Sequence, residues 1–343
     1  MRLGRGTAHR VRLGCGTAHS VRPEGAREGA EVEFLAFCCV FSYISPSGGI
    51  RMEYRQFGNT EIEVSVLGFG AGHVGSPEQD DAAMGRLLNQ ILDSGITLLD
   101  TARGYGLSEE RIGRHLSGRR AEFVLSTKIG YGVEGVADWT AECISRGIDE
   151  ALQRLNTDYI DIVHLHSCEM DAITDPLLEP MVRAAEAGKI RVLAYSGDND
   201  AAEYAARCGS FGSIETSVNI CDQRSITRVV EPAAGAGMGV IAKRPVANAP
   251  WRFEVEPAGH YAHEYWKRWK AMDIDPAGLP WQELALRFVL TVPGVSTCIA
   301  GTASPVHLKE NIAIAAKGPL DAALYDTICT VFNEHDAGWI GQV

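Results

Sequence analysis

Short apolar segments rich in β-branched residues alternate along the chain with amphipathic stretches of helical length. From Val64 onward this alternation is typical of parallel strands joined by helical crossovers. Eight strand and helix pairs within roughly 250 residues favour a closed (β/α)8 TIM barrel over an open sheet. The predicted strands are VSVLGFG (64–70), ITLLDTA (96–102), FVLSTKIG (123–130), YIDIVHLH (159–166), IRVLAYSG (190–197), SIETSVNI (213–220), GVIAKRPV (239–246) and VSTCIAGT (295–302).

Three segments depart from the regular alternation. Residues 52–70, MEYRQFGNTEIEVSVLGFG, hold two short alternating segments on either side of Gly58 and Asn59, which predicts a β-hairpin. The connection after the seventh strand, residues 247–279, is too long for a plain linker and predicts a long loop. Residues 320–335, LDAALYDTICTVFNEH, predict one more helix. The expected fold is an α/β (β/α)8 TIM barrel with an N-terminal β-hairpin, a long loop after strand 7 and an extra C-terminal helix.

The start of the chain lacks these periodic patterns. Residues 2–11, RLGRGTAHRV, are nearly repeated as residues 12–21, RLGCGTAHSV, and this Gly/Arg-rich stretch has neither a helical nor a strand period. Such a segment buries little apolar surface. We expect residues 1–51 to be a disordered or non-native extension, and residues 52–343 to form the barrel domain.

Composition narrows the class of protein. With 45% hydrophobic and 22% charged residues, the 343-residue chain lies in the ordinary globular range. The net charge of −12 argues against nucleic acid as the main partner, so a bound anion must be held by local groups. The longest apolar run, residues 34–44, is about half the length that spans a bilayer, and acidic residues precede it where a secretory signal needs positive charge.

The cysteine pattern bears on compartment and metal binding. The nine cysteines are scattered and include no CxxC pair, so neither a disulfide framework nor a zinc site is indicated. We therefore expect a cytoplasmic protein that acts on a small molecule and contacts no membrane. The oligomeric state stays open.

Three titratable residues end successive predicted strands. Asp100 ends ITLLD, Lys128 ends FVLSTK and His166 ends YIDIVHLH. Each alone is commonly a hydrogen-bonded strand terminus. In a barrel, however, the three side chains meet in one cavity at the carboxyl ends of the strands, where active sites of this fold lie and where burial and mutual charge shift pKa values.

Tyr105 lies in the loop after the strand that ends at Asp100. A phenol has an unperturbed pKa near 10, so it becomes an effective proton donor only when a nearby cation stabilises the phenolate. Lys128 is the expected cation, held charged by Asp100, and His166 is expected to hydrogen-bond the reacting oxygen. This set suits carbonyl reduction, in which a cofactor delivers hydride to carbon and a side chain protonates oxygen, without a metal.

Several segments carry a family resemblance in order and at suitable spacing. From about Met52 to the end, the chain resembles the aldo-keto reductase superfamily in LLDTARGYGLSEERIG, FVLSTKIG, LNTDYIDIVHLHS, AGKIRVLAYSG and STCIAGTASPVHLKENIAIA. The resemblance implies a (β/α)8 barrel, NAD(P)-dependent interconversion of carbonyls and alcohols, and tyrosine as the general acid or base. The family's catalytic tetrad falls on Asp100, Tyr105, Lys128 and His166.

The resemblance also implies where a nicotinamide cofactor lies. GAGHVG (70–75) fits the dinucleotide-binding pattern GxGxxG, but the next acidic strand end is about 30 residues on, rather than the 20 of an open-sheet site. The resemblance instead sets Gly70, Ala71 and Gly72 near the ribose and nicotinamide. The family's carboxamide-binding Ser-Asn pair falls on Ser196 and Gly197.

Further positions depart from the family's cofactor contacts. The family's glutamine at the carboxamide falls on Glu215, its stacking aromatic on Lys243 and a small serine on Arg244. These two basic residues are expected at the pyrophosphate, the alternative being solvated loop charge. At the adenine end, GTASPVHLKEN (301–311), the family's cations fall on Gly301, Ala303 and His307. The positions assigned to this end are Thr302, Ala303, His307 and Asn311. NADP(H) is expected, with NAD(H) as the competitor.

Two other functions fit parts of the pattern. Some family members act as cofactor-binding regulatory or auxiliary subunits with little turnover, which the altered cofactor contacts would allow. A barrel aldolase would use Lys128 as a Schiff-base nucleophile, but Asp100 favours its charged form. The substrate stays open between sugars, aromatic aldehydes and small ketones. Tryptophans expected either to line a pocket or to pack are Trp139, Trp251, Trp266, Trp269 and Trp339.

Overall fold

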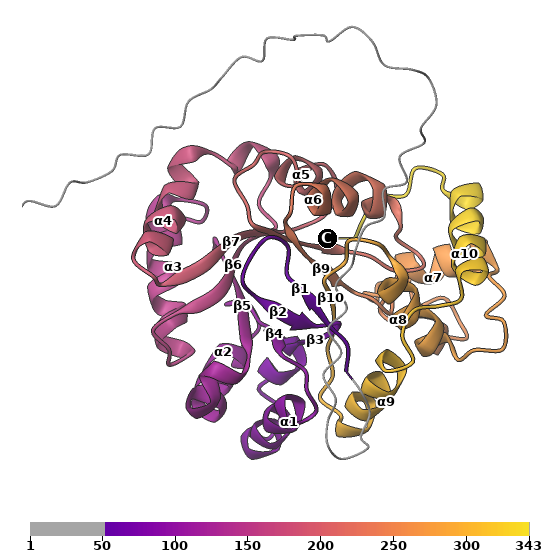
Figure 1. Cartoon of the computed structure of the whole chain (residues 1–343), viewed down its shortest axis with the longest axis horizontal. Coiled ribbons are helices and arrows are strands. Elements are labelled where there is room, and N and C mark those ends of the chain that lie inside the picture. Colours follow the sequence, from indigo (N-terminus) through magenta and orange to yellow (C-terminus); the bar gives the residue numbers. More distant parts are fainter. Residues whose placement is uncertain (1–51, 343) are drawn as a thin grey trace, which may run out of the picture. The chain divides into compact units, whose positions relative to one another are not determined.

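The computed structural model describes residues 52–342 (Figure 1). The predicted extension, residues 1–51, lies outside this range, so the domain division stays a prediction. Within the described part of the chain, no helix is both long and apolar enough to cross a membrane. The expected cytoplasmic location also stays a prediction.

Eight parallel strands close into a barrel, as predicted. The strand order is β10-β3-β4-β5-β6-β7-β8-β9, so each strand pairs with its neighbours in sequence and the last closes on the first. Each predicted strand is confirmed, in somewhat shorter form. The strands are β3 (Leu67–Gly70), β4 (Leu98–Asp100), β5 (Val124–Ile129), β6 (Ile160–His166), β7 (Ile190–Ser196), β8 (Ser213–Ser217), β9 (Gly239–Lys243) and β10 (Thr297–Ala300).

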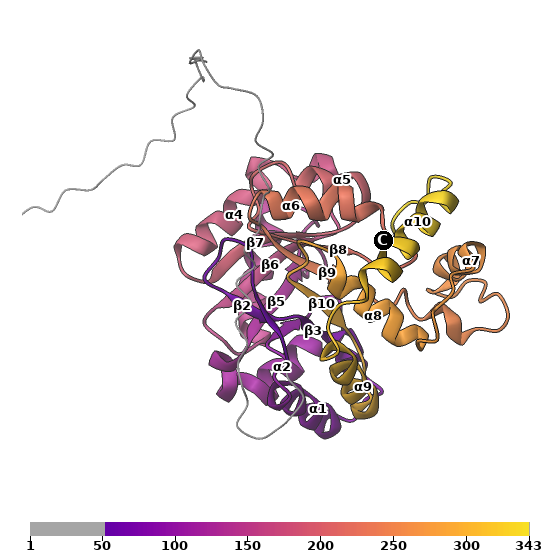
Figure 2. The ribbon, with the colours of Figure 1, turned by 45° about the vertical axis from the view of Figure 1, so that its right-hand side comes forward.

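Helices surround the strands, as Figure 2 shows. The α1 helix illustrates why they form: Asp80 accepts a hydrogen bond from the Ala83 N–H at the helix start, and Met84, Leu88 and Ile91 recur on one buried face. The helices around the barrel are α1 (Asp81–Asp93), α2 (Ser108–Leu116), α3 (Ala141–Arg154), α4 (Asp175–Glu186), α5 (Asn199–Ala205), α6 (Glu231–Gly235), α8 (Trp281–Thr291) and α9 (Pro305–Ala315). Short 3-10 or π segments are η1 (Ala71–Gly75), η2 (Ser117–Glu122), η3 (Met170–Ala172), η4 (Ile226–Val230) and η5 (Pro250–Arg252).

Two of the predicted departures from the barrel repeat contain helices. The extra C-terminal helix is α10 (Ala322–His335). The long connection after β9 is not entirely a loop, because it contains α7 (His263–Met272). The buried face of α7 consists of Tyr265, Arg268 and Met272. Because one of these residues is charged, the pattern of apolar positions along the sequence did not indicate a helix here.

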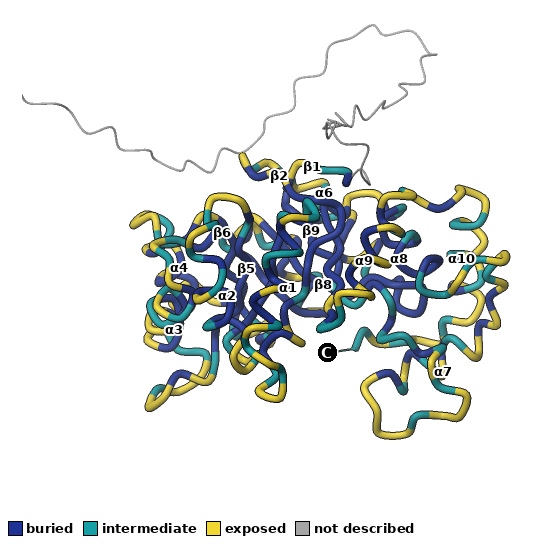
Figure 3. Tube along the Cα trace, turned by 90° about the horizontal axis from the view of Figure 1, so that it is seen from below, coloured by how far each residue is buried: buried dark blue, intermediate teal, exposed yellow. Residues whose placement is uncertain are grey.

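The predicted hairpin closes the amino-terminal end of the barrel. Strands β1 (Tyr54–Gln56) and β2 (Glu63–Ser65) pair antiparallel, and Phe57 directly after β1 and Val64 within β2 are fully buried. These side chains pack against Leu98 and Ile241 from the barrel strands. Burial of each such side chain contributes about 1.5–3 kcal/mol. Figure 3 shows the hairpin at one end of the barrel and the C-terminus at the other.

Candidate active site

Predicted polar residues lie at the carboxyl end of the barrel. Asp100 is the last residue of β4 and His166 the last of β6, while Lys128 is the penultimate residue of β5. Ser196 ends β7 beside His166 in register. The barrel therefore brings together side chains that are far apart in the sequence.

Lys128 lies at the centre of this cluster. Its ammonium forms an ion pair with Asp100 and donates to the Thr101 carbonyl at 3.1 Å. The Ser126 hydroxyl donates to Asp100 Oδ1 at 2.8 Å, and all these side chains are buried. Burial alone lowers the pKa of Lys128, but the carboxylates of Asp100 and Glu215 outweigh it and raise that pKa above its ordinary value. Lys128 is therefore a fixed cation.

Glu215 supplies a second carboxylate to the same ammonium. The Glu215 Oε2 lies 3.4 Å from Lys128 Nζ and 3.9 Å from His164 Nε2, and the side chain is 2% exposed. No residue of the described chain donates a hydrogen bond to this oxygen. Burial and the charge of Glu215 together raise the pKa of Asp100 to about 7, against the opposing effect of Lys128. Two carboxyl groups thus share one cation, which the sequence did not predict.

Tyr105 reaches the same cation from the loop after β4. Lys128 Nζ lies 5.2 Å from the centre of the Tyr105 ring. The Lys128 charge lowers the pKa of Tyr105, as predicted, but burial and the charges of Asp100 and Glu215 outweigh it and raise that pKa to about 12. The cation named from the sequence therefore acts in the expected direction, and burial and the two carboxylates oppose it.

His166 has an aromatic partner that the sequence did not single out. Its Nδ1 lies 2.8 Å from the hydroxyl of Tyr131, whose ring stacks on the imidazole at 5.3 Å. Tyr105 meets His166 edge-on at 6.0 Å, and Trp139 packs against Tyr131. Burial and the Lys128 charge lower the pKa of His166 to about 3, so the imidazole is neutral. The available signal was an aromatic residue directly after FVLSTKIG.

Asp100, His164 and Glu215 form a group with the spacing of metal ligands. One ligand atom of each lies within 4.8 Å of the others, and all three are buried. Lys128 forms ion pairs with both carboxylates, so a cation already occupies this cluster. Burial lowers the pKa of His164 to about 4, which keeps it neutral.

The predicted glycine contacts lie beside Tyr105. Gly70 ends β3 and Ala71 begins η1, so the rest of the GAGHVG motif forms a 3-10 segment instead of opening an α-helix. A Cβ on Gly72 would lie 3.9 Å from the Tyr105 ring, and one on Gly301 would lie 2.7 Å from the Gly70 carbonyl. The segment after β3 therefore borders the tyrosine, and the segment after β10 borders the end of β3.

Ser196 and Glu215 lie next to each other on β7 and β8. The two residues are partners in the strand register, and both are buried. The Ser196 hydroxyl and Glu215 Oε2 have no hydrogen-bond partner in residues 52–342. Because buried polar atoms are nearly always paired, these two atoms fit a polar ligand group.

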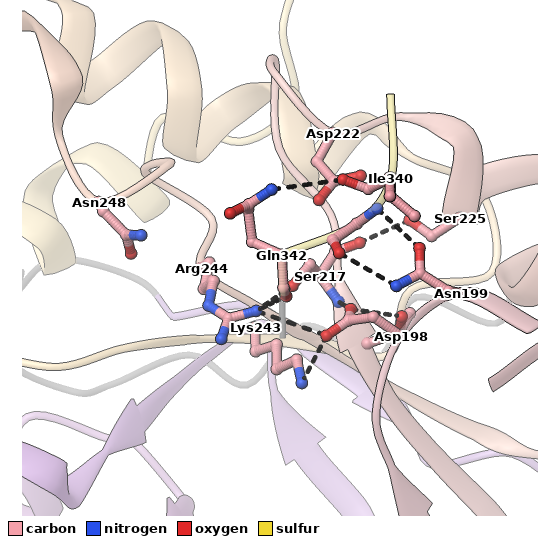
Figure 4. Close-up of polar contacts among 12 residues, drawn as sticks. Asp198, Asn199, Ser217, Asp222, Ser225, Lys243, Arg244, Asn248, Ile340 and Gln342 are labelled. Atoms are coloured by element: carbon pink, nitrogen blue, oxygen red, sulfur yellow. Dashed lines mark hydrogen bonds and ion pairs between the residues drawn. The ribbon is translucent and has the colours of Figure 1, made fainter. Parts of the chain in front are cut away.

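Lys243 and Arg244 converge on a carboxylate that the sequence analysis overlooked, as Figure 4 shows. Lys243 Nζ lies 3.0 Å and Arg244 Nη1 3.4 Å from Asp198 Oδ2, which is buried after β7. Arg244 also donates to the Tyr261 hydroxyl at 2.7 Å and to the Gln342 carbonyl of the C-terminal segment. These cations are therefore not solvated loop charge, and because two of them share one carboxylate they carry one positive charge in excess.

The backbone after β9 is unusual. Arg244, Ala247, Asn248 and Ala249 have φ values of 54°, 48°, 57° and 51°, in the left-handed region that residues with a Cβ rarely adopt. Three of these residues are consecutive. Such conformations cost free energy and concentrate at ligand-binding segments.

The positions expected at the adenine end lie around the start of α9. Thr302 and Asn311 are buried, Ala303 is half-buried and His307 is exposed. Asn311 Oδ1 accepts a hydrogen bond from Gln282 at 2.9 Å, so this amide also serves the packing of α8 against α9. Of these residues, His307 is the most accessible to a ligand.

Most of the singled-out tryptophans pack within the connection after β9 and the last helix. Trp251 and Trp269 contact Trp281 at 6.0 and 5.3 Å, and Trp339 contacts Phe332 at 5.5 Å. The Trp266 indole donates to the Phe253 carbonyl. Trp139 differs, because it packs beside Tyr131 at the mouth of the barrel.

Comparisons with known proteins agree with this architecture. The model of the Aldo/keto reductase family matches residues 66–331. L-galactose dehydrogenase of Arabidopsis thaliana is 28% identical over 282 residues, covering 77% of this chain and 88% of that protein. A probable voltage-gated potassium channel subunit beta of Oryza sativa subsp. japonica is 34% identical over 140 residues, covering 39% of this chain and 42% of that protein.

Solved structures lead to the same family. The holo form of an aldo-keto reductase from Bacillus halodurans is similar with a TM-score of 0.73 and 30% identity, covering 82% of this chain and 96% of that chain. The family match spans most of the described barrel, and the fold and the relatives agree with it. The chain therefore belongs to the aldo/keto reductase family and is an oxidoreductase that acts on carbonyl compounds.

Proposed function

We propose that the protein is a nicotinamide-dependent oxidoreductase that interconverts an aldehyde or ketone and an alcohol. The observation that carries the proposal is the buried Asp100–Lys128 ion pair beside Tyr105, with His166 at the same end of the barrel. This arrangement provides a proton donor, a cation to stabilise its conjugate base and a neutral hydrogen-bonding group.

The proton follows a short path. When bound, the cofactor supplies a hydride to the carbonyl carbon in reduction and accepts one in oxidation. In reduction the Tyr105 hydroxyl donates its proton to the carbonyl oxygen, and Lys128 stabilises the phenolate that forms. Asp100 keeps Lys128 in place. In oxidation the phenolate takes the proton from the alcohol.

His166 holds the reacting oxygen. Its Nδ1 faces the Tyr131 hydroxyl at 2.8 Å. With Tyr131 donating to Nδ1, the remaining proton of the neutral ring is on Nε2, which donates to the substrate oxygen. Tyr131 therefore positions His166 and fixes its tautomer.

We assign a separate group of residues to each part of the cofactor. The unpartnered Ser196 hydroxyl and Glu215 Oε2 suit the amide of the nicotinamide. The strained segment after β9, with Lys243 and Arg244, suits the pyrophosphate. Gly70, Ala71 and Gly72 give close backbone approach at the ribose, and Thr302, Ala303, His307 and Asn311 lie at the adenine end.

We propose NADP(H) as the cofactor, with NAD(H) as the competitor. His307 and Lys309 are the cations in GTASPVHLKEN, which has no arginine to grip a 2'-phosphate bidentately. Steady-state kinetics with both cofactors distinguish the two. A kcat/KM for NADH more than about tenfold above that for NADPH would overturn the first choice, since tenfold corresponds to about 1.4 kcal/mol.

The central test is Tyr105→Phe. This variant keeps the ring but has no proton to give, so carbonyl reduction falls by at least about 100-fold while cofactor binding, measured by calorimetry, persists. The matched control is Tyr325→Phe, whose ring lies on α10 and stacks on Phe288 of α8. Unchanged turnover in Tyr105→Phe would refute the proposed chemistry.

Two alternatives have their own readouts. The similarity to a probable potassium channel subunit beta favours an auxiliary role as the second candidate. The test is a panel of carbonyls and alcohols, which includes sugars because one relative is L-galactose dehydrogenase. Cofactor binding without turnover of any compound in this panel would support the auxiliary role. The aldolase reading predicts a Lys128 adduct after borohydride treatment, and the raised pKa of Lys128 opposes it.

A further inference from the structure

We propose that Glu215 sets the redox preference of the cofactor site, because its buried carboxylate favours the oxidised, positively charged nicotinamide over the reduced, neutral one. The inference rests on the proposed function, since it assumes that the nicotinamide lies at the carboxyl ends of β7 and β8. It goes further by predicting which form of the cofactor binds more tightly.

The charges of the buried cluster do not cancel. Asp100 and Lys128 form one neutral ion pair, and Glu215 adds a further negative charge 3.4 Å from Lys128 Nζ. His164 and His166 are the titratable groups of β6 that face this cluster, and burial keeps both neutral. With both carboxyl groups ionised, the site therefore carries one negative charge in excess.

The nearest basic side chains outside the cluster, Lys243 and Arg244, pair with a different carboxylate. Lys243 ends β9 next to β8, and its ammonium forms an ion pair with Asp198, as does Arg244 (Figure 4). Asp198 is itself buried and also accepts hydrogen bonds from Thr216 and Ser217. Because two cations share this one carboxylate, they offset part of the Glu215 charge, but the carboxylate of Glu215 is the one at the carboxyl ends of β7 and β8 where the nicotinamide is expected.

Besides its ion pair with Lys128, Glu215 Oε2 accepts no hydrogen bond from the described residues, at the point where a ligand is expected. Its Oε2 and the Ser196 hydroxyl beside it are the unpartnered polar atoms at this point of the described barrel. A glutamine at this position would offer an amide of similar size and no charge. The distinguishing property of Glu215 is therefore electrostatic.

A buried charge acts strongly on a nearby ring. Opposite charges attract far more in a protein interior than in water, because the surroundings screen them less. The oxidised nicotinamide carries a positive charge that neutralises the excess, whereas the reduced ring leaves it in place. The site therefore favours the oxidised cofactor, which suits a protein that oxidises alcohols.

The experiment measures dissociation constants of both forms of one cofactor. Isothermal titration calorimetry of the full-length chain at alkaline pH compares the wild type with Glu215→Gln, Glu215→Asp and Glu283→Gln. The wild type should bind the oxidised form more tightly than the reduced form, and Glu215→Gln should shift the ratio of the two constants toward the reduced form by at least about tenfold. Glu215→Asp keeps the charge and should retain the wild-type preference.

Glu283→Gln is the matched control. Glu283 is a buried carboxylate on α8 paired with Arg287 and Lys317, so its loss changes the net charge equally without touching the barrel interior. Its ratio should equal that of the wild type. A ratio in Glu215→Gln within about twofold of the wild type would overturn the inference, since twofold is well under 1 kcal/mol.

The wild-type measurement also stands alone if Glu215→Gln fails to fold. Equal binding of both forms, or tighter binding of the reduced form, by the wild type would overturn the inference while leaving the proposed oxidoreductase intact. Failure of the wild type to bind either form of NAD or NADP would overturn the proposed function and the inference with it.

Discussion

Gly75 lies directly against the backbone of Tyr105. A Cβ on Gly75 would be 1.6 Å from the Tyr105 carbonyl oxygen, and the Leu107 N–H donates to the Gly75 carbonyl at 2.9 Å. The η1 segment after β3 therefore seats the loop that carries the proposed proton donor. The position of Tyr105 therefore depends on the absence of a side chain at Gly75, which precedes α1 and β4 in the chain.

Substitution of Gly75 by alanine should therefore displace Tyr105. Because a misplacement of about 1 Å costs on the order of 100-fold, kcat of Gly75→Ala should fall by roughly that factor. Steady-state kinetics check this against Gly118→Ala, whose new methyl group would meet nothing within 4 Å. Equal kcat values for the two variants would show that the close packing does not fix the loop.

Tyr131→Phe should weaken catalysis without abolishing it. The change removes the hydroxyl 2.8 Å from His166 Nδ1 but keeps the stacked ring, so His166 loses its tautomer control and not its packing. The loss of about 1 kcal/mol expected for one hydrogen bond corresponds to a kcat about fivefold lower, with cofactor affinity unchanged. An unaltered kcat would remove Tyr131 from the mechanism.

The buried His164 should make stability depend on pH. Burial lowers its pKa from 6.5 to about 4, so below pH 6.5 the unfolded chain binds a proton that the folded chain does not. Stability is therefore lost as pH falls from 6.5 toward 4, with a slope of up to about 1.4 kcal/mol per pH unit from this group. His164→Gln should remove that part of the slope.

Urea unfolding at several values from pH 7 to pH 5 measures this slope. Asp100 contributes with the opposite sign, because its pKa is raised to about 7 and its folded form holds a proton longer than the unfolded form. The comparison of variant with wild type isolates His164, and exposed His307→Gln serves as control. Parallel pH profiles for wild type and His164→Gln would contradict the assignment.

Asp198→Ala should be strongly destabilising. The substitution leaves Lys243 and Arg244 without their carboxylate and removes the acceptor for the Ser217 N–H. Breaking a buried ion pair in this way lowers the free energy of unfolding by about 3 kcal/mol. Chemical denaturation checks the value against Asp200→Ala, which removes an 82% exposed carboxylate paired with Arg228. A similar small change in both variants would mean that Asp198 is dispensable.

Residues at strand ends were predictable and residues that meet across the barrel were not. Asp100 and His166 each end an apolar run, and the fold brings such ends together. Lys128 and Glu215 lie on β5 and β8, which are not neighbours in the sheet, so their contact through the barrel interior has no pattern along the chain. The opposing effect of Glu215 on the pKa of Tyr105 arises across the barrel in the same way.

The contacts of side chains outside the strands were even harder to predict from the sequence. Asp198 follows a strand end, yet nothing in the sequence tells that Lys243 and Arg244 turn toward it instead of toward solvent. Tyr131 likewise follows β5 by two residues, and its partnership with His166 depends on the path of the loop. In both cases the loop conformation decides, and loop conformation follows from tertiary packing more than from local periodicity.

The hairpin β1–β2 has a practical consequence for handling the protein. It covers the barrel end opposite the carboxyl ends of the strands and presents exposed side chains such as Glu61 to solvent. An anchor coupled at Glu61 would immobilise the molecule on a solid support with the loops at the carboxyl ends of the strands facing the bulk solution. The end covered by β1–β2 would then fix the orientation of the molecule on a sensor surface or in a flow reactor.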